Sequence, residues 1–258
     1  MGFYVHKKEN IFFIVKVLAT LSIVGAFWLG MGAGDKIASG LKTFGFYVLG
    51  FMTFAWIRSG LFVGFVRGSC VRVGPEQFPD IYSILSSHST LLNLKQIPSL
   101  YIMQQGGILN ALAMRFVGKN YVVIYSDVLA AAYKEGVDAV SFIIAHELGH
   151  IKRMHMTKNL FLFPSLFVPF LHNAYSRACE YTCDGIGFGL NQSGSVKGLC
   201  ILSVGPALHD KVNIIKYIEE SSRERGFWVW LSEKLSSHPF LPNRIANLGK
   251  IHQLRTLG

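Results

Sequence analysis

Cysteine is scarce in this chain, and its spacing excludes two common uses of the thiol. The 258 residues include four cysteines, Cys70, Cys179, Cys183 and Cys200, which form neither a recognisable disulfide framework nor a CxxC zinc pair. We therefore expect them to be reduced and buried, as suits a protein on the cytoplasmic side of a membrane. One alternative stays open, because Cys179 and Cys183 lie one helical turn apart and could themselves bind a metal as thiolates.

Acidic residues are also few. The 15 Asp and Glu residues stand against 25 Lys and Arg residues, which gives a formal net charge of +10. The basic excess is concentrated near the N-terminus, and nothing in the sequence resembles a nucleic-acid-binding module. The sequence has no internal repeat and no low-complexity tract. We attribute the positive charge to contact with anionic lipid headgroups and expect no nucleic-acid partner.

Long apolar runs are present, by contrast, and both lie in the first quarter of the chain. They cover about residues 11–33 and 44–66, and each is as long as the ~20 residues that cross a bilayer as a helix. The short segment at residues 35–40 predicts a turn between them, so the two runs form a transmembrane hairpin. A cleaved signal peptide is the alternative for the first run. It is disfavoured because the run exceeds the ~7–15 apolar residues of a signal sequence and a second run follows.

The basic residues around this hairpin predict its orientation. Lys7 and Lys8 precede the first run and Arg67 follows the second, against Lys36 and Lys42 between them. Positive residues favour the cytoplasmic side, so both ends of the hairpin are expected there. The prediction is an integral membrane protein of a bacterial-type inner membrane. Residues 1–73 form the anchor, and residues 74–258 form a catalytic domain that faces the cytoplasm.

Residues 146–150 carry the strongest functional signal, because they read His-Glu-Leu-Gly-His. In a helix, His146 and His150 share one face, so both imidazoles can reach the same Zn²⁺. Glu147 lies between them, where it can take a proton from a water molecule. The pattern predicts a zinc hydrolase on a helix that Asp138 opens as the N-cap residue.

A catalytic zinc needs a third protein ligand, and the sequence excludes one common source of it. In a metzincin Gly and His would occupy the positions of Arg153 and Met156. His155 is one residue out of register for that pattern, so we expect it on a basic, solvated face. Glu180 lies on a later helix with Asp184 one turn after it. Glu180 is therefore the predicted third ligand, while Asp184 either orients a ligand histidine or donates a proton.

These two motifs together resemble a family. HExxH followed by ExxxD is similar to the HtpX-type membrane zinc metallopeptidases, relatives of the CAAX prenyl proteases and of the mitochondrial protease OMA. Asn110–Ala113 resembles a segment that precedes the active-site helix in that family. Ser237–Phe240 with Arg244 resembles its C-terminal His-Pro-Pro…Arg element, although Phe240 replaces the second Pro.

The resemblance implies a fold, a cofactor and a set of site residues. The fold would be mostly α with a small β-sheet (α+β), a gluzincin-like peptidase domain attached to the hairpin. One Zn²⁺ per chain would be bound, with no other cofactor, and the partners would be a polypeptide substrate and the lipid bilayer. The implied zinc ligands are His146, His150 and Glu180, the implied base is Glu147, and Asp184 is the implied proton donor.

The rest of the catalytic part contains weaker signals. Apolar and β-branched content predicts a helix at 79–94, strands at 99–104 and 121–125, and mostly helices after Glu180. The strand near Asn110 or the one at Tyr121 would either hold an extended substrate or only build the core. The apolar residues 160–171 form either a loop at the membrane interface, which we favour, or a buried turn. His238 and Arg244 would either stabilise an oxyanion or cap local structure, which we favour.

The sequence as a whole predicts a membrane-anchored zinc metalloendopeptidase. Two alternatives compete with it. A non-catalytic membrane protein with a zinc-stabilised, client-binding domain would have no need of Glu147. A protease for prenylated peptides would need more than one membrane hairpin to enclose the lipid.

Overall fold

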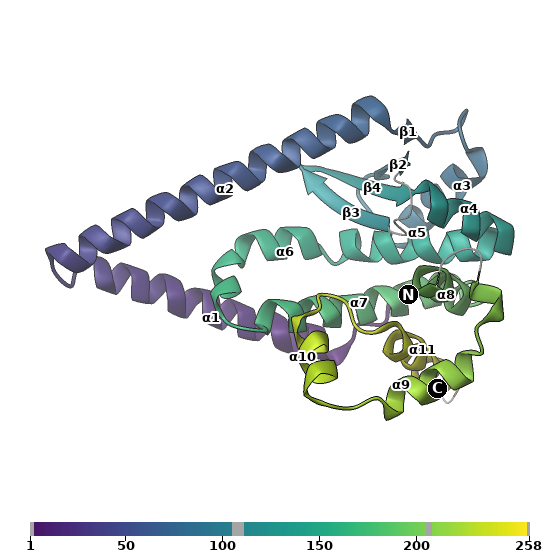
Figure 1. The fold of residues 1–258 in the computed structure, drawn as a ribbon. Helices are drawn as coiled ribbons and strands as arrows, with labels where there is room; N and C mark the ends of the chain where they lie inside the picture. Colours follow the sequence, from purple (N-terminus) through teal and green to yellow (C-terminus); the bar gives the residue numbers. More distant parts are fainter. Residues whose placement is uncertain (1–2, 105–110, 205–207, 257–258) are drawn as a thin grey trace.

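The computed structural model describes residues 3–104, 111–204 and 208–256. Its long helices (Figure 1) are α1 (Lys7–Met31), α2 (Asp35–Ser69), α3 (Pro79–Leu91), α4 (Ser126–Glu135), α5 (Val137–Lys152), α6 (His155–Phe161), α7 (Leu171–Leu190), α8 (Ser195–Val204), α9 (Ile214–Arg223), α10 (Phe227–Leu235) and α11 (Leu241–Thr256). Short 3-10 helices cover Phe163–Phe167 and His209–Lys211. The strands are β1 (Val71–Arg72), β2 (Ser99–Met103), β3 (Ala111–Phe116) and β4 (Lys119–Tyr125). The predicted fold class, mostly α with a small sheet, is confirmed.

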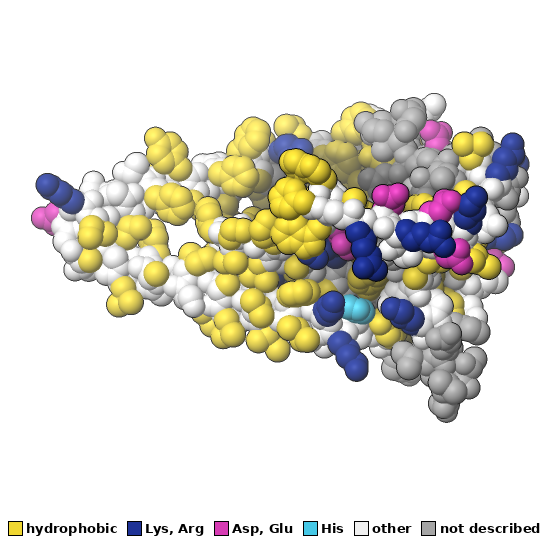
Figure 2. Space-filling view, turned by 60° about the horizontal axis from the view of Figure 1, so that its bottom comes forward, with side chains coloured by type: hydrophobic (Ala, Val, Ile, Leu, Met, Phe, Trp, Pro, Cys, Tyr) yellow, Lys and Arg dark blue, Asp and Glu magenta, His cyan; other side chains and the backbone are white. Residues whose placement is uncertain are grey.

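Helices α1 and α2 form a long hairpin that projects from the rest of the molecule (Figure 1). Both are long and apolar enough to cross a membrane. The turn lies earlier than expected: residues 35–40 are helical, and Gly34, with φ of 118°, precedes α2. Hydrophobic side chains cover much of the hairpin, whereas charged side chains gather at the opposite end of the face shown in Figure 2. This distribution suits a hairpin in lipid, with the charged end of the molecule in water.

The 35-residue helix α2 is longer than a bilayer requires. At 1.5 Å per residue it extends about 52 Å, against ~30 Å for the hydrocarbon core. Its C-terminal end packs against the sheet, where Val63 and Val66 are buried. Helix α2 and the sheet therefore share a hydrophobic cluster.

The four strands form one mixed sheet with the order β1-β2-β4-β3. β2 and β4 are parallel, whereas β1 and β3 pair antiparallel to their neighbours. Strand β4 is apolar on both faces: Val122 and Ile124 pack into the main core with α3, α4 and α5, while Tyr121, Val123 and Tyr125 pack toward α2. β3 is an edge strand, and this edge lies beside α5.

Helices α5 and α7 pack side by side and form the centre of the molecule. Their close approach depends on Gly149, where a Cβ atom would lie 3.1 Å from Cys183 Sγ and 3.2 Å from Cys183 Cα. The predicted cap of α5 is wrong by two residues, since Gly136 is the N-cap and Asp138 lies in the first turn. Asp138 instead accepts hydrogen bonds from Asn191 Nδ2 at 3.0 Å and Ser193 Oγ at 2.7 Å, which ties α5 to the end of α7.

The apolar residues 160–171 do not form one helix. They contain the end of α6, a 3-10 helix and the start of α7, as two prolines in the segment require. Pro164 and Ser165 are buried, whereas several large apolar side chains are exposed: Leu160, Phe161, Leu166, Phe167 and Phe170. Contact of this exposed surface with the membrane stays a prediction.

Candidate active site

The three predicted zinc ligands lie together between α5 and α7. His146 Nε2 is 3.4 Å from Glu180 Oε2, and His150 Nε2 is 3.3 Å from Glu180 Oε1. One ligand atom from each of the three residues lies within 4.8 Å of the other two. The i, i+4 spacing on α5 places both imidazoles on the face toward α7, where Glu180 meets them. We call His146, His150 and Glu180 the ligand triad.

The geometry of the ligand triad fits zinc. Ligand atoms about 2.0–2.2 Å from a tetrahedral zinc lie roughly 3.3–3.6 Å from one another. The imidazole-to-carboxylate distances, 3.4 Å from His146 to Oε2 and 3.3 Å from His150 to Oε1, are close to this value, each with a different oxygen of Glu180. Two imidazoles and one carboxylate are also a common donor set of hydrolytic zinc sites.

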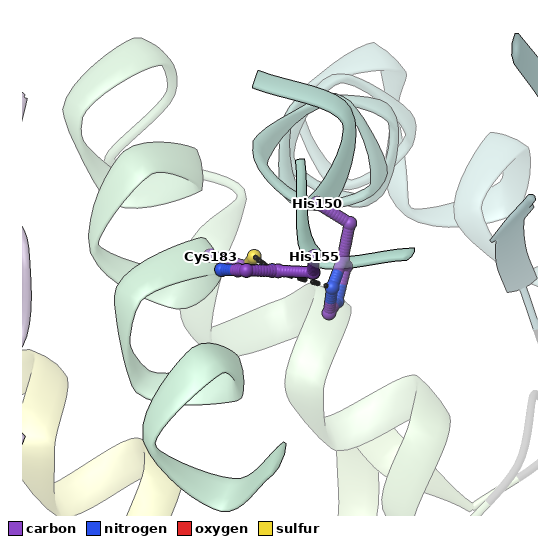
Figure 3. Close-up of side chains that lie close together, drawn as sticks. All are labelled: His150, His155 and Cys183. Carbon is purple, nitrogen blue, oxygen red and sulfur yellow. Dashed lines mark hydrogen bonds between the residues drawn. The ribbon is translucent and has the colours of Figure 1, made fainter. Parts of the chain in front are cut away.

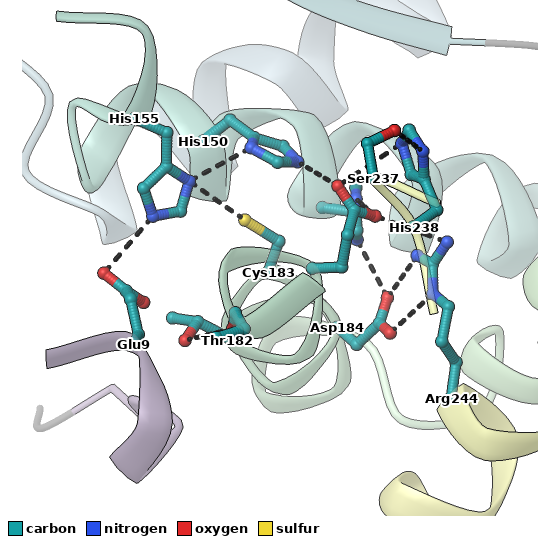
Figure 4. A network of polar contacts seen from close by, with 12 residues as sticks. Glu9, His150, His155, Thr182, Cys183, Asp184, Ser237, His238 and Arg244 are labelled. Atoms are coloured by element: carbon teal, nitrogen blue, oxygen red, sulfur yellow. Dashed lines mark hydrogen bonds and ion pairs between the residues drawn. The ribbon is translucent and has the colours of Figure 1, made fainter. Parts of the chain in front are cut away.

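A second carboxylate, Asp184 of α7, and a buried arginine, Arg244 of α11, contact the triad. Asp184 is fully buried, and its Oδ1 lies 2.9 Å from His146 Nδ1. Arg244 of α11 donates to both oxygens of Asp184, from Nη2 at 2.6 Å and from Nε at 2.8 Å. Its Nη1 lies 3.3 Å from Glu180 Oε2. The guanidinium thus holds both carboxylates in place (Figure 4 shows its contacts with Asp184).

The charges in this cluster determine its protonation. Burial alone would raise the pKa of Glu180 and of Asp184, but Arg244 and the neighbouring imidazoles hold the pKa of both carboxyls below its usual range. Burial would lower the pKa of His146, but Asp184 and Glu180 outweigh it and raise this pKa to about 10. The two carboxylates therefore favour positive charge at the centre of the site, which a divalent cation supplies.

His155 does not lie on a solvated face, so that expectation is wrong. Its side chain is buried, and its Nδ1 lies 3.0 Å from His150 Nδ1. The reason is local: Met154 adopts a left-handed conformation with φ of 57°, and the chain turns so that His155 opens α6 against α5. On the other side of its ring, Nε2 lies 3.3 Å from Glu9 Oε1 of α1. Burial lowers the pKa of His155 to about 4, so this imidazole is neutral at pH 7.

All four cysteines are free, and Cys179, Cys183 and Cys200 are buried as expected, whereas the expected burial of Cys70 is wrong because this residue is half-buried at the end of α2. Figure 3 shows Cys183 beside His150 and His155, and these three side chains form another group with metal-ligand spacing. Burial raises the pKa of Cys183 well above its usual value, so this thiol is protonated while no metal is bound. Thiolates are typical of closed structural zinc sites, whereas two imidazoles and one carboxylate suit a hydrolytic zinc, and the ligand triad is therefore the favoured site.

The ligand triad lines a cavity of about 260 Å³ that Glu147 also lines. Ala111, Leu112 and Ala113 of the edge strand β3 form another part of its wall. Among the residues that the structure describes, β3 has an unpaired sheet edge, whereas β4, which contains Tyr121, is paired on both sides. Asn110 lies outside the described residues. Asp184 does not line the cavity, whereas Arg244 and His238 do.

The sequence predicted that His146, Glu147, His150 and Glu180 belong to one site, and all four line the same cavity, but it did not predict the contacts of three further residues. Arg244 was expected as a cap, and it is a buried partner of two carboxylates. Glu9 was assigned to the anchor, although an acidic residue at the start of an apolar helix is a sequence signal that could have indicated a buried polar contact. His155 had no such signal, because helical periodicity does not place residues five apart on one face.

A comparison with known protein families shows the family of the chain. The sequence profile of peptidase family M48 matches residues 75–171 and 159–252, which is more than half of the chain. The chain belongs to peptidase family M48. The expected similarity to HtpX-type enzymes is thereby confirmed at the level of this family.

M48 peptidases are zinc metalloproteases, so the predicted enzyme class, a protease that acts on polypeptides, is confirmed. No curated protein matches the chain. Among solved structures, this M48 peptidase is similar to the crystal structure of Ste24p from S. mikatae. The two share 14% sequence identity and a TM-score of 0.49 over 95% of this chain and 67% of that chain.

Proposed function

We propose that this M48 peptidase is a membrane-anchored endopeptidase that holds one zinc ion between His146, His150 and Glu180. The single observation that carries the proposal is the convergence of this triad, at 3.3 and 3.4 Å, on the cavity that Glu147 lines. When bound, zinc supplies Lewis acidity that polarises the scissile carbonyl and lowers the pKa of the attacking water toward ~7.

Glu147 acts as the general acid and base of the reaction. Its carboxylate takes the proton of the water that attacks the carbonyl, and it returns a proton to the departing amine nitrogen. Asp184 was the other candidate proton donor. Its complete burial and its two hydrogen bonds from Arg244 support instead a role in positioning His146.

The substrate is an extended polypeptide that pairs with the free edge of β3. Such pairing satisfies the main-chain groups of the substrate and leaves specificity to its side chains. Because β3 and the ligand triad line one cavity, a peptide on this edge lies next to the triad. The two apolar helices and the flanking lysines and arginines support substrates that belong to the membrane, with the catalytic part on the cytoplasmic side.

The test is cleavage of casein, an unfolded protein, by the full chain purified in detergent and loaded with zinc. Glu147→Gln keeps the size of the side chain and removes its basicity, so the rate should fall at least ~10²-fold. Glu219→Gln makes the same chemical change at an exposed carboxylate of α9 and should leave the rate unchanged. Equal rates for the parent chain and Glu147→Gln would refute the proposed role of Glu147.

A further inference from the structure

The geometry points to a second function for the N-terminal helix: Glu9 of α1 positions the zinc ligand His150 through His155. This inference rests on the proposed zinc site and concerns how that site is held. Neither Glu9 nor His155 lines the cavity, so both are positioning residues.

The two ring nitrogens of His150 face different partners. Nε2 faces Glu180 at 3.3 Å, on the side of the ligand triad, and Nδ1 faces His155 Nδ1 at 3.0 Å. An imidazole that binds a metal through Nε2 carries its proton on Nδ1. His150 must therefore donate to His155, and only the tautomer of His155 with a bare Nδ1 can accept this hydrogen bond.

That requirement fixes the proton of His155 on Nε2, which faces Glu9. Nε2 lies 3.3 Å from Glu9 Oε1, so the carboxylate accepts this second hydrogen bond (Figure 4). The three groups thus form one chain in which every proton has a single consistent place: His150 donates to His155, and His155 donates to Glu9. A carboxylate at the end of such a chain selects the tautomer of the ligand and makes it a better donor to zinc.

Glu9 is itself held firmly. It is fully buried, and Arg153 donates to its Oε1 from Nη2 at 2.8 Å and from Nε at 3.0 Å. The start of α1 is also docked on α7. The backbone N–H of His6 donates to Thr182 Oγ1 at 3.0 Å, and Gly185 lets the ring of Tyr4 pack directly against α7.

The other histidine ligand has an equivalent arrangement. The Nδ1 atom of His146 faces Asp184, which Arg244 holds. His150 has the same parts, a carboxylate held by an arginine, with one imidazole inserted between them. The difference is their origin: Asp184 and Arg244 belong to the catalytic part, whereas Glu9 belongs to the helix that the sequence assigns to the anchor. Helix α1 therefore completes the metal site as well as anchoring the chain.

The inference is tested by the zinc affinity of the full chain in detergent, measured by competition with a chromogenic chelator. His155→Phe keeps a ring but removes the acceptor for His150, and the Kd for zinc should rise about 10–100-fold. His155→Asn keeps an acceptor near the position of Nδ1 and removes the contact with Glu9. This variant and Glu9→Gln should therefore show similar, smaller increases, each of several-fold.

Two further measurements separate positioning from simple loss of structure. Glu9→Gln introduced into His155→Asn should add little to the Kd, because the link between them is already broken. Lys16→Met removes another buried charge of α1. Lys16 does not contact His150 but donates to Asn159 Oδ1 at 2.9 Å, so this variant should leave the Kd for zinc within ~3-fold of the parent. The Co²⁺-substituted parent should show ligand-field bands that shift in His155→Phe, with no thiolate-to-metal charge-transfer band.

Each opposite result overturns the inference. Unchanged affinity in His155→Phe and Glu9→Gln would show that the chain of hydrogen bonds has no effect on the metal. An equal loss in Lys16→Met would assign the effect to undocking of α1, and a thiolate band would assign His155 to a site with cysteine. The proposed function fails separately, if the parent itself binds no zinc.

Discussion

Arg244 is the residue whose removal has the most predictable cost, because the structure gives it two buried partners. The residue is 5% exposed, and its guanidinium contacts Asp184 at 2.6 Å and Glu180 at 3.3 Å. Arg244→Met keeps apolar bulk but leaves both carboxylates without their cation. Breaking a buried ion pair from one side costs about 3–5 kcal/mol, since the remaining charge is desolvated and unpaired. For a chain of this size that corresponds to a fall in Tm of roughly 6–20 °C.

Zinc changes the expected size of this effect. A bound Zn²⁺ supplies positive charge next to Glu180, so it offsets part of the loss of the guanidinium. The deficit in Tm between the parent and Arg244→Met should therefore be larger with excess chelator than with saturating zinc. Without Arg244 the imidazole of His146 is the only other cation in contact with Asp184 among the described residues, and it cannot replace a two-point contact.

The assay is thermal unfolding in detergent, followed by tryptophan fluorescence with and without zinc. Arg225→Met provides the matched control, because Arg225 is exposed on the loop before α10 and its loss should change Tm by less than ~2 °C. If Arg244→Met melts within ~2 °C of Arg225→Met under both conditions, the reasoning about buried carboxylates is refuted. Arg244→Lys should fall between the two, because it keeps the charge and loses the bidentate geometry.

Two more predictions follow from close packing and from burial. Gly149→Ala places a methyl group 3.1–3.3 Å from Cys183 atoms and should force α5 and α7 apart by a few tenths of an ångström; overpacking of this kind costs about 1–3 kcal/mol and should raise the Kd for zinc. Gly68→Ala, where nothing lies within 4 Å, is the control, and equal affinities in the two variants would contradict the prediction. Burial lowers the pKa of His88 from 6.5, while its Nε2 lies 2.8 Å from Ser141 Oγ. The unfolded chain therefore binds a proton more readily, and this contribution to stability is complete above pH ~6.5 and is lost as the pH falls toward the folded pKa. His88→Gln should flatten the fall of Tm between pH 7.5 and 5.5, and an unchanged slope would exclude His88 as a source of acid sensitivity.

The sequence by itself determined the parts of the site that depend on helical periodicity. The i, i+4 rule places His146 and His150 on one face and fixes Glu147 between them, because these positions depend only on local backbone geometry. The same rule relates Glu180 to Asp184. The two apolar runs likewise predicted α1 and α2, since composition over ~20 residues is a local property too.

Only the tertiary structure decided how these local elements combine. The pairing of Glu180 with the two histidines depends on the approach of α5 to α7 at Gly149, and the partners of Asp184 depend on where α11 packs. The contact of His155 with His150 requires a turn at Met154 that no periodicity contains. Glu9 and His155 are 146 residues apart in the sequence, and their side chains lie 3.3 Å from each other in the fold. Such pairings are set by side-chain packing between distant segments, and a single sequence does not encode them in any local pattern.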